Sequence, residues 1–252
     1  MSAADAGFSL EGRNAVVTGG SKGIGAAISR RLAGAGARVA VWGRDMASAE
    51  ALAEEIGGIA VSCDVTSTES VEEATRRTRE QLGSIDVMVA NAGRAGEGIA
   101  FDAIDDDLWA DVIDTNLTGV WRCVRAVVPG FKEQRSGKVI IIGSIGAVTG
   151  MSRAPAYSAA KAGLLGLSRS AAAALARYDV QVNTVLPGWI QTEMSSPELG
   201  NDALRTRLED RTLARRTAVP DEVAGVCVYL ASPASSFHTG DVIRVDGGYL
   251  VA

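Results

Sequence analysis

The sequence predicts an α/β fold, with one doubly wound parallel sheet of about seven strands and helices on both faces. Short runs rich in Val and Ile alternate with longer amphipathic segments rich in Ala and Leu along the whole chain. Several of the short runs are apolar nearly throughout, as expected for parallel strands that are covered on both sides. Because no linker-like stretch or fixed-period repeat interrupts the 252 residues, we expect a single domain over residues 1–252.

Each strand is expected where β-branched residues concentrate, and each helix between two strands. We predict strands at Asn14–Thr18, Arg38–Val41, Ile59–Ser62, Ile85–Ala90, Lys138–Ser144, Gln181–Leu186 and Val242–Val245. We predict helices at Gly23–Gly36, Met46–Ile56, Ser67–Leu82, Asp106–Gln134, Ala156–Tyr178 and Asp221–Ala231. The fourth of these contains Gly119, Pro129 and Gly130, so we expect it to bend or to end early. In such sheets ligands bind at the carboxyl ends of the strands, so the residues after each strand are the first candidates for a site.

The charge and the apolar runs indicate a protein that binds neither nucleic acid nor membrane. Net charge is −5, and acidic and basic residues are interspersed. The longest apolar runs, such as Val139–Ile142, are far too short to span a bilayer. Met1–Gly7 is small and acidic rather than basic and then apolar, which argues against a secretory signal.

The cysteines and the histidine point to a reducing compartment and no metal site. Cys63, Cys123 and Cys227 are odd in number and widely spaced, so we expect reduced, buried thiols in the cytoplasm. His238 is the only histidine, which excludes a zinc site built on histidine ligands. We therefore expect no metal.

A glycine-rich segment follows the first predicted strand and leads directly into a helix. It reads Thr18-Gly19-Gly20-Ser21-Lys22-Gly23-Ile24-Gly25. Glycines let the backbone approach a pyrophosphate closely, and the free N–H groups at the start of the helix favour an anion. The spacing differs from the commoner Gly-x-Gly-x2-Gly fingerprint, and a tight turn without a ligand is the alternative. Its position at the first crossover favours a dinucleotide site in a Rossmann-type domain.

The end of the second predicted strand indicates which dinucleotide binds. An NAD site usually carries Asp or Glu there, about twenty residues after the glycines. Here the strand ends in Gly43-Arg44, and we interpret Asp45 as the cap of the next helix. Arg44 and Lys22 could both bind a 2′-phosphate, although two solvated surface charges are the alternative. The pattern favours NADP(H), with NAD(H) as the second choice.

Tyr157 and Lys161 lie four residues apart near the start of a strongly helical segment. Residues at this spacing share one helix face, so the phenol and the ammonium can meet at one site. A neighbouring cation favours the phenolate, and we expect it to lower the pKa of Tyr157 towards neutrality. Ser144 ends a predicted strand thirteen positions earlier, where a side chain of the site should emerge. A half-buried ring beside a surface lysine is the alternative.

Together these motifs resemble those of the classical short-chain dehydrogenase/reductases, and the match covers almost the whole chain. The motifs are Thr18-Gly19-x3-Gly23-x-Gly25, Asn91-Ala92-Gly93, Asn116, Ser144, Tyr157-x3-Lys161 and Pro187-Gly188. The resemblance implies catalytic roles for Asn116, Ser144, Tyr157 and Lys161: proton donor (Tyr157), carbonyl orientation (Ser144), ribose binding and control of the Tyr157 pKa (Lys161), and a water relay (Asn116). It implies cofactor contacts by Gly19, Ser21, Lys22, Gly23, Ile24, Gly25, Arg44, Asp64, Val65, Asn91, Ala92, Gly93, Tyr157, Lys161, Pro187, Gly188, Ile190 and Thr192. It also implies a homotetramer, although a dimer would serve as well.

Structural roles compete with some of these assignments. Asn116 could be bonded to backbone within a helix, and Asp64 is about as well explained by a turn or helix cap as by an adenine contact. Asn91-Ala92-Gly93 is largely architectural under either interpretation. Trp189 could line a substrate pocket or only pack.

The substrate is left open by the sequence. Gly188–Leu213 resembles the family's substrate-covering lid, and Arg94, Glu97 or Arg153 could lie at the mouth of the site, where an arginine would bind an acidic group. The 3-oxoacyl-[acyl-carrier-protein] reductases are near neighbours. However, Pro129 and Ala173 stand where those reductases commonly present arginine to the carrier protein.

We therefore expect an NADP(H)-dependent oxidoreductase that acts on a ketone or secondary alcohol. The alternatives are an NAD-dependent alcohol, sugar or steroid dehydrogenase, and a catalytically inert nucleotide-binding regulatory protein. A nucleotide-binding methyltransferase fold would leave the pair Tyr157 and Lys161 unexplained.

Overall fold

The computed structural model describes residues 7–95 and 98–252. These residues form a seven-stranded sheet in the order β3-β2-β1-β4-β5-β6-β7, and every neighbouring pair is parallel. The strands are β1 (Asn14–Thr18), β2 (Arg38–Gly43), β3 (Ile59–Ser62), β4 (Val87–Ala90), β5 (Gly137–Ile142), β6 (Val180–Pro187) and β7 (Val242–Val245). The predicted doubly wound sheet is confirmed, and the strand order reverses between β1 and β4.

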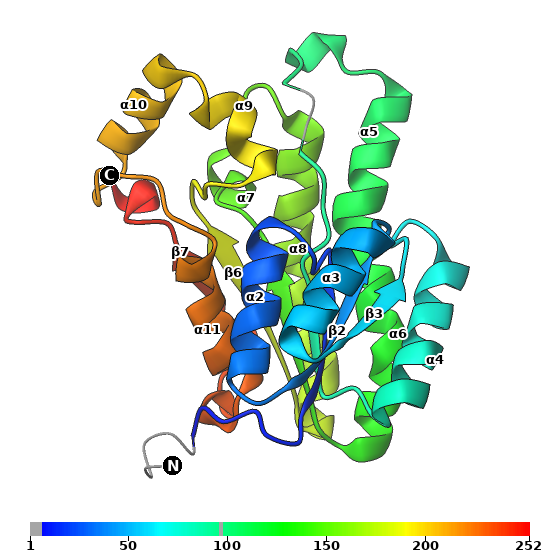
Figure 1. The fold of residues 1–252 in the computed structure, drawn as a ribbon. Coiled ribbons are helices and arrows are strands. Elements are labelled where there is room, and N and C mark those ends of the chain that lie inside the picture. The colour runs from blue at the N-terminus through cyan, green and yellow to red at the C-terminus, as the bar shows by residue number, and fades with distance from the viewer. Residues whose placement is uncertain (1–6, 96–97) are drawn as a thin grey trace.

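Helices cover both faces of the sheet (Figure 1). On one face lie α2 (Gly23–Gly34), α3 (Met46–Ile56) and α11 (Asp221–Ala231). On the other lie α4 (Thr68–Leu82), α6 (Gly119–Gln134) and α8 (Pro155–Leu175). Strand residues alternate between the two cores, as Val16 and Val17 of β1 do.

The helical segment Asp106–Gln134 does not end early at Gly119, Pro129 or Gly130, which were the residues expected to interrupt it. It runs as α5 (Asp106–Ile113), one π-helical turn (Asp114–Thr118) and α6, with Pro129 inside α6. Pro129 is exposed, while the opposite side of α6 buries a row of apolar residues that ends at Phe131. Burial of that row offsets the hydrogen bond that proline cannot make. The irregular turn lies instead at Asn116.

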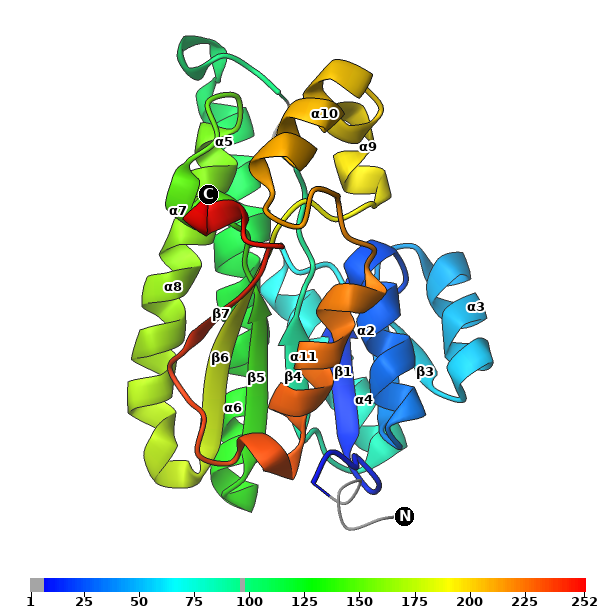
Figure 2. The same cartoon turned by 90° about the vertical axis from the view of Figure 1, so that its left-hand side faces the viewer.

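The segment after β6 contains two short helices that the sequence did not predict. These are α9 (Ser196–Leu199) and α10 (Asp202–Arg211), and they lie over the carboxyl end of the sheet (Figure 2). A third short helix, α7 (Gly146–Thr149), follows β5. A small apolar cluster lies under α9 and α10, made of Ile145, Leu208 and Tyr249 with Trp189, Leu199 and Leu250 around it.

The three cysteines are buried and unpaired, as expected. Within residues 7–95 and 98–252, no helix is long and apolar enough to cross a membrane.

Candidate functional site

The predicted site residues gather at the carboxyl ends of β1, β4, β5 and β6. Thr18 ties two of these ends together, because its Oγ1 accepts hydrogen bonds from the N–H groups of Asn91 and Ala92, both at 2.9 Å. The Asn91 amide in turn donates to the carbonyls of Thr18 (3.0 Å) and Gly19 (3.2 Å). Asn91 therefore has the architectural role that we considered for it, bracing the glycine-rich loop.

The glycine-rich loop has a shape that only glycine permits. Gly19 and Gly23 have φ of +58° and +51°, in the left-handed region. A side chain at Gly25 would collide with the Gly19 carbonyl and the Asn91 amide. The following helix α2 has no side-chain cap at its start, so its first N–H groups remain available to an anion. This bare cradle fits a pyrophosphate.

At the end of β2, Arg44 is placed as expected for binding a 2′-phosphate, whereas Lys22 is paired with a carboxylate that the sequence argument did not assign to it. Arg44 is exposed at the carboxyl end of the strand. Asp45 caps α3 as predicted, since its carboxylate accepts from Ser48 N (3.2 Å). It also forms an ion pair with Lys22, 2.9 Å between Nζ and Oδ2, and this hydrogen-bonded partner raises the pKa of Lys22. Lys22 thus lies near the end of β2, as predicted, but it is paired there with the Asp45 carboxylate.

Asp64 follows β3 and forms a turn. Its Oδ1 accepts from the N–H and the hydroxyl of Thr66, at 3.0 and 2.7 Å. Burial acts to raise the pKa of Asp64, but these bonds and the charges of Arg44 and Arg122 outweigh it, and the pKa lies below its usual value. The neighbouring Val65 is buried against Gly119 of α6.

Tyr157, Ser144 and Lys161 converge beside β5. The strand ends at Ile142, two residues before Ser144 rather than at it. Ser144 Oγ accepts from Gly146 N at 3.0 Å, and the Ser144 side chain lies close enough to Tyr157 to act on the pKa of its phenol. Lys161 is only 4% exposed; its Nζ donates to the Ile142 carbonyl (2.9 Å) and lies 5.6 Å from the centre of the Tyr157 ring.

The electrostatics of this group differ from our expectation. Burial raises the pKa of Tyr157, and the hydrogen bond with Ser144 only partly opposes this. The predicted lowering of the Tyr157 pKa is therefore wrong for this structure. The same burial lowers the pKa of Lys161 to about 8. Both groups are shifted towards their neutral forms, because desolvation penalises either charge.

Asn116 is fully buried within the π-helical turn. Its amide donates to the carbonyls of Arg94 and Val112, both at 3.0 Å, and its Oδ1 accepts from Arg94 N at 3.2 Å. A methyl group placed on Gly93 would lie 2.7 Å from Asn116 Oδ1 and 3.7 Å from Lys161 Nζ. Asn116 and Lys161 therefore converge on Gly93, and π-helical turns are often found at functional sites.

The segment after β6 approaches the glycine-rich loop. Gly188 lies so close to Asp246 that a side chain would collide with its backbone, and Ile190 is buried. The methyl group of Thr192 would lie 3.2 Å from a Cβ on Gly23, and Thr192 forms a reciprocal hydrogen-bonded cap with Ser195.

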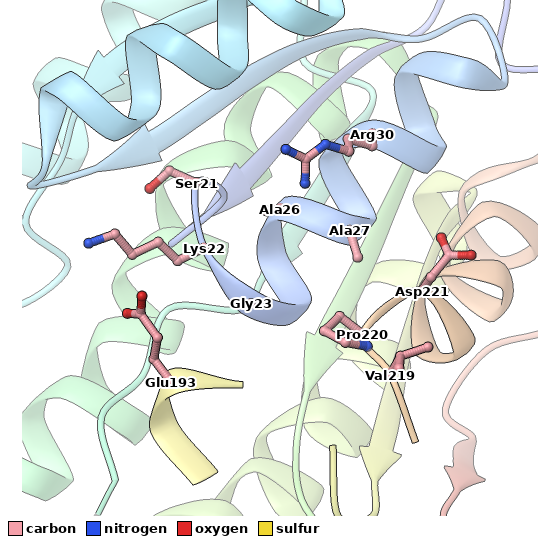
Figure 3. Close-up of a pocket in the computed structure, with 10 residues that line it drawn as sticks. All are labelled: Ser21, Lys22, Gly23, Ala26, Ala27, Arg30, Glu193, Val219, Pro220 and Asp221. Carbon is pink, nitrogen blue, oxygen red and sulfur yellow. The ribbon is translucent and has the colours of Figure 1, made fainter. Parts of the chain in front are cut away.

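A pocket of about 460 Å³ opens beside this contact (Figure 3). It is lined by Ser21, Lys22, Gly23, Ala26, Ala27, Arg30, Glu193, Val219, Pro220 and Asp221. It includes three of the predicted cofactor residues but not Ser144, Tyr157 or Lys161. Lys22 and Glu193 project on the same side of it (Figure 3), and Glu193 is a charge that our sequence argument missed.

The two arginines expected at the mouth of the site both bind neighbouring segments of the chain. Arg94 forms an ion pair with Asp111 of α5. Arg153 donates from Nε to the Gly98 carbonyl at 2.6 Å. Glu97, the third charge expected there, lies outside the described residues.

Comparisons with known proteins agree with this arrangement. A family model described as "Enoyl-(Acyl carrier protein) reductase" matches residues 19–250. The chain is 38% identical over 247 residues to 3-oxoacyl-[acyl-carrier-protein] reductase FabG of Vibrio harveyi, covering 97% of this chain and 100% of the relative. The chain belongs to the short-chain dehydrogenase/reductase family. The expected class, an NAD(P)-dependent oxidoreductase acting on an alcohol/carbonyl pair, is thereby confirmed.

Solved short-chain dehydrogenase/reductases share the whole fold. A putative gluconate dehydrogenase from Agrobacterium tumefaciens superposes with a TM-score of 0.95 at 34% identity, covering 98% of this chain and 99% of that one. A gluconate 5-dehydrogenase from Burkholderia cenocepacia, solved in complex with NADP and tartrate, also reaches 0.95, at 32% identity and 99% coverage of both chains.

Proposed function

We propose that this chain uses NADP(H) to interconvert a ketone and a secondary alcohol, with Tyr157 as the acid/base. The observation that carries the proposal is the convergence of Ser144, Tyr157 and Lys161 beside β5. Two neutral hydroxyls and a buried amine at the carboxyl end of a doubly wound sheet suit the polarisation of a carbonyl oxygen. Membership of an oxidoreductase family supports the assignment.

The cofactor site assigned from the sequence fits the shape of the chain. The bare start of α2 and the loop residues Gly19, Ser21, Lys22, Gly23, Ile24 and Gly25 would hold the pyrophosphate, and Lys22 with Arg44 the 2′-phosphate. Asp64, Val65, Asn91, Ala92 and Gly93 would line the adenosine, Tyr157 and Lys161 the nicotinamide ribose, and Pro187, Gly188, Ile190 and Thr192 the nicotinamide end. The bound nicotinamide would supply or accept the hydride.

The side chains would manage the proton. With its pKa raised by burial, the Tyr157 phenol is protonated at neutral pH and is ready to donate to a carbonyl oxygen. Ser144, beside Tyr157, would orient that oxygen. Lys161 would hold ribose hydroxyls, and its ammonium would stabilise the phenolate as it forms. Asn116 holds the Arg94 backbone beside Lys161, where it would also anchor a water relay.

Residues 188–213 would act as the substrate lid of a single domain spanning residues 1–252. The two helices α9 and α10 rest on the apolar cluster that begins at Ile145, next to Ser144. Closure of this segment would exclude water from the carbonyl.

We favour a small substrate over one attached to a carrier protein. Pro129 and Ala173 are exposed and uncharged, so neither of these positions offers a cation to an acidic carrier. Arg153 uses Nε to hold Gly98, and its terminal nitrogens could receive a carboxylate. Our first candidate substrate is therefore a keto acid or a polyhydroxy acid, the latter of the kind named for the solved gluconate dehydrogenases. The acyl-carrier-protein thioester, named for the Vibrio relative, is the second candidate.

The assembly is inferred from the surface of one helix, and the compartment from the cysteines. The exposed Ala173 and Ala174 on α8 form a flat surface that suits helix packing in a homotetramer. The three buried, unpaired thiols suit the reducing cytoplasm.

Titration with NADPH and NADH, followed by reduction of a ketone panel, tests the proposal. We expect Arg44→Ala to weaken NADPH binding about 10-fold and NADH binding little, since only one cofactor carries the 2′-phosphate. Tyr157→Phe should still bind cofactor but lose about 10²–10⁴-fold in kcat. A wild-type chain that binds neither cofactor would support the inert regulatory protein instead.

A further inference from the structure

The predicted 2′-phosphate site contains acidic side chains as well as Lys22 and Arg44. Lys22 Nζ lies 2.9 Å from Asp45 Oδ2, and the negative charge of Glu193 also helps to raise the pKa of Lys22. The positive charge of Arg44 in turn helps to lower the pKa of Asp64. The two cations that would bind a phosphate are thus surrounded by three carboxylates.

The backbone brings these groups to one place. Gly20 N donates to the Trp42 carbonyl (3.3 Å), which joins the glycine-rich loop to the end of β2. Ser21 Oγ lies 3.8 Å from the point where a side chain on Gly43 would begin. Lys22, Arg44 and Asp45 therefore project from two segments that are bonded to each other.

Asp45 is fixed in its position and in its charge. Its carboxylate accepts from Ser48 N (3.2 Å) and from Ser48 Oγ (2.7 Å) at the start of α3. These bonds and Lys22 lower the pKa of Asp45 to about 2, so the group is ionised throughout the neutral range. A phosphate that approaches Lys22 meets this carboxylate already bound to it.

We propose that Asp45 is a specificity-determining residue that opposes the 2′-phosphate, so that the chain accepts both NADP(H) and NAD(H). NADP must share Lys22 with Asp45 and brings about two negative charges close to a fixed carboxylate. NAD has only a hydroxyl at that point and avoids the repulsion. Arg44 favours one cofactor and Asp45 weakens the preference. This inference rests on the cofactor site of the proposed function.

The decisive variant is Asp45→Asn. Asparagine caps a helix as well as aspartate does, so the variant removes the charge and keeps the start of α3. Asp45→Ser, which also caps, is a second variant in case the first folds poorly. The matched control is Glu55→Gln, which removes another exposed carboxylate of α3 that is paired with an arginine of α2 rather than with Lys22.

Dissociation constants for NADPH and NADH are measured from the fluorescence of the reduced nicotinamide, at low and high salt. We expect Asp45→Asn to tighten NADPH binding roughly 5-fold while NADH stays within about 2-fold, with a smaller gain at high salt. Glu55→Gln should leave the ratio of the two constants unchanged. If both cofactors bind the wild-type chain and Asp45→Asn leaves this ratio unchanged, the inference is overturned. If neither cofactor binds, the proposed function fails, and the inference with it.

Discussion

Lys161 and Tyr157 lie one helical turn apart, with the Lys161 ammonium 5.6 Å from the centre of the Tyr157 ring and hydrogen-bonded to the end of β5. This relationship joins the group that we propose to donate the proton to a buried amine. Because the two groups are this close, we expect loss of the Lys161 charge to change the acidity of the Tyr157 phenol.

We expect the reductive kcat/KM to fall as pH rises through about 8. Burial lowers the pKa of Lys161 to about 8, so its cation, which would stabilise the phenolate, is lost above that value. Burial raises the pKa of Tyr157, so the phenol stays protonated over the same range. A pH profile of the initial rate measures the alkaline limb.

Lys138 provides a control for this profile. Burial also lowers its pKa to about 8, but its Nζ bonds to Ser235, near the amino end of β5 and away from Ser144. Lys138→Gln should leave the alkaline limb in place. A limb that disappears in this variant would contradict the assignment to Lys161.

We expect Lys161→Met to raise the free energy of unfolding while it abolishes activity. In the folded chain the pKa of Lys161 is about 8, below its unfolded value. At pH 7 the side chain is therefore charged while it is buried, and this lowers the free energy of unfolding. Between pH 8 and the unfolded pKa the unfolded chain binds more protons, so this penalty shrinks as pH rises.

Urea unfolding at pH 7 and at pH 9.5 measures this effect. At pH 7 the methionine variant should have a free energy of unfolding about 1–3 kcal/mol higher than the wild type, reduced by the loss of the hydrogen bond to Ile142. At pH 9.5 the gain should be smaller. A variant that is less stable at pH 7 would mean that the bond to Ile142 outweighs the desolvation of the charge.

We expect Arg153→Ala to raise KM about 10-fold for carboxylate substrates, because a charge-assisted hydrogen bond is lost. Neutral ketones should keep their KM within about 2-fold. Steady-state kinetics over both kinds of substrate measure the difference, with Arg169→Ala, an exposed arginine of α8, as the control. An equal rise for every substrate would mean that Arg153 acts only by holding Gly98.

We expect Leu208→Ala to loosen the proposed lid. Leu208 is 7% exposed in the cluster with Ile145 and Tyr249, whereas Leu204 of the same helix is 37% exposed. Loss of the packing should speed tryptic cleavage near α10 by roughly an order of magnitude and raise the substrate KM. Leu204→Ala should change neither. Equal cleavage of the two variants would show that the cluster does not hold the segment.

The strands and the main site residues could be predicted because both depend on local patterns. Runs of Val and Ile marked all seven strands, and Ser144 and the glycine-rich loop follow strands whose carboxyl ends share one edge of the sheet. The helices α9 and α10 could not be predicted, since they are short and lie in a segment rich in polar residues, and only the cluster around Leu208 shows why they form. The pKa of Tyr157 was missed because spacing reveals a neighbour but not the burial of both groups.

The π-helical turn at Asp114–Thr118 determines how this chain would respond to the insertion or deletion of a residue between α5 and α6. A π-helical turn takes up one extra residue, so deleting one residue from this turn would let α5 and α6 continue as one regular α-helix. Asn116 would lose its position against the Arg94 backbone, while Lys161 and Ser144, on other elements, stayed where they are. The contact made by Asn116 thus depends on one extra residue in this helix, and the loss of a single codon would remove it without moving the other residues of the candidate site.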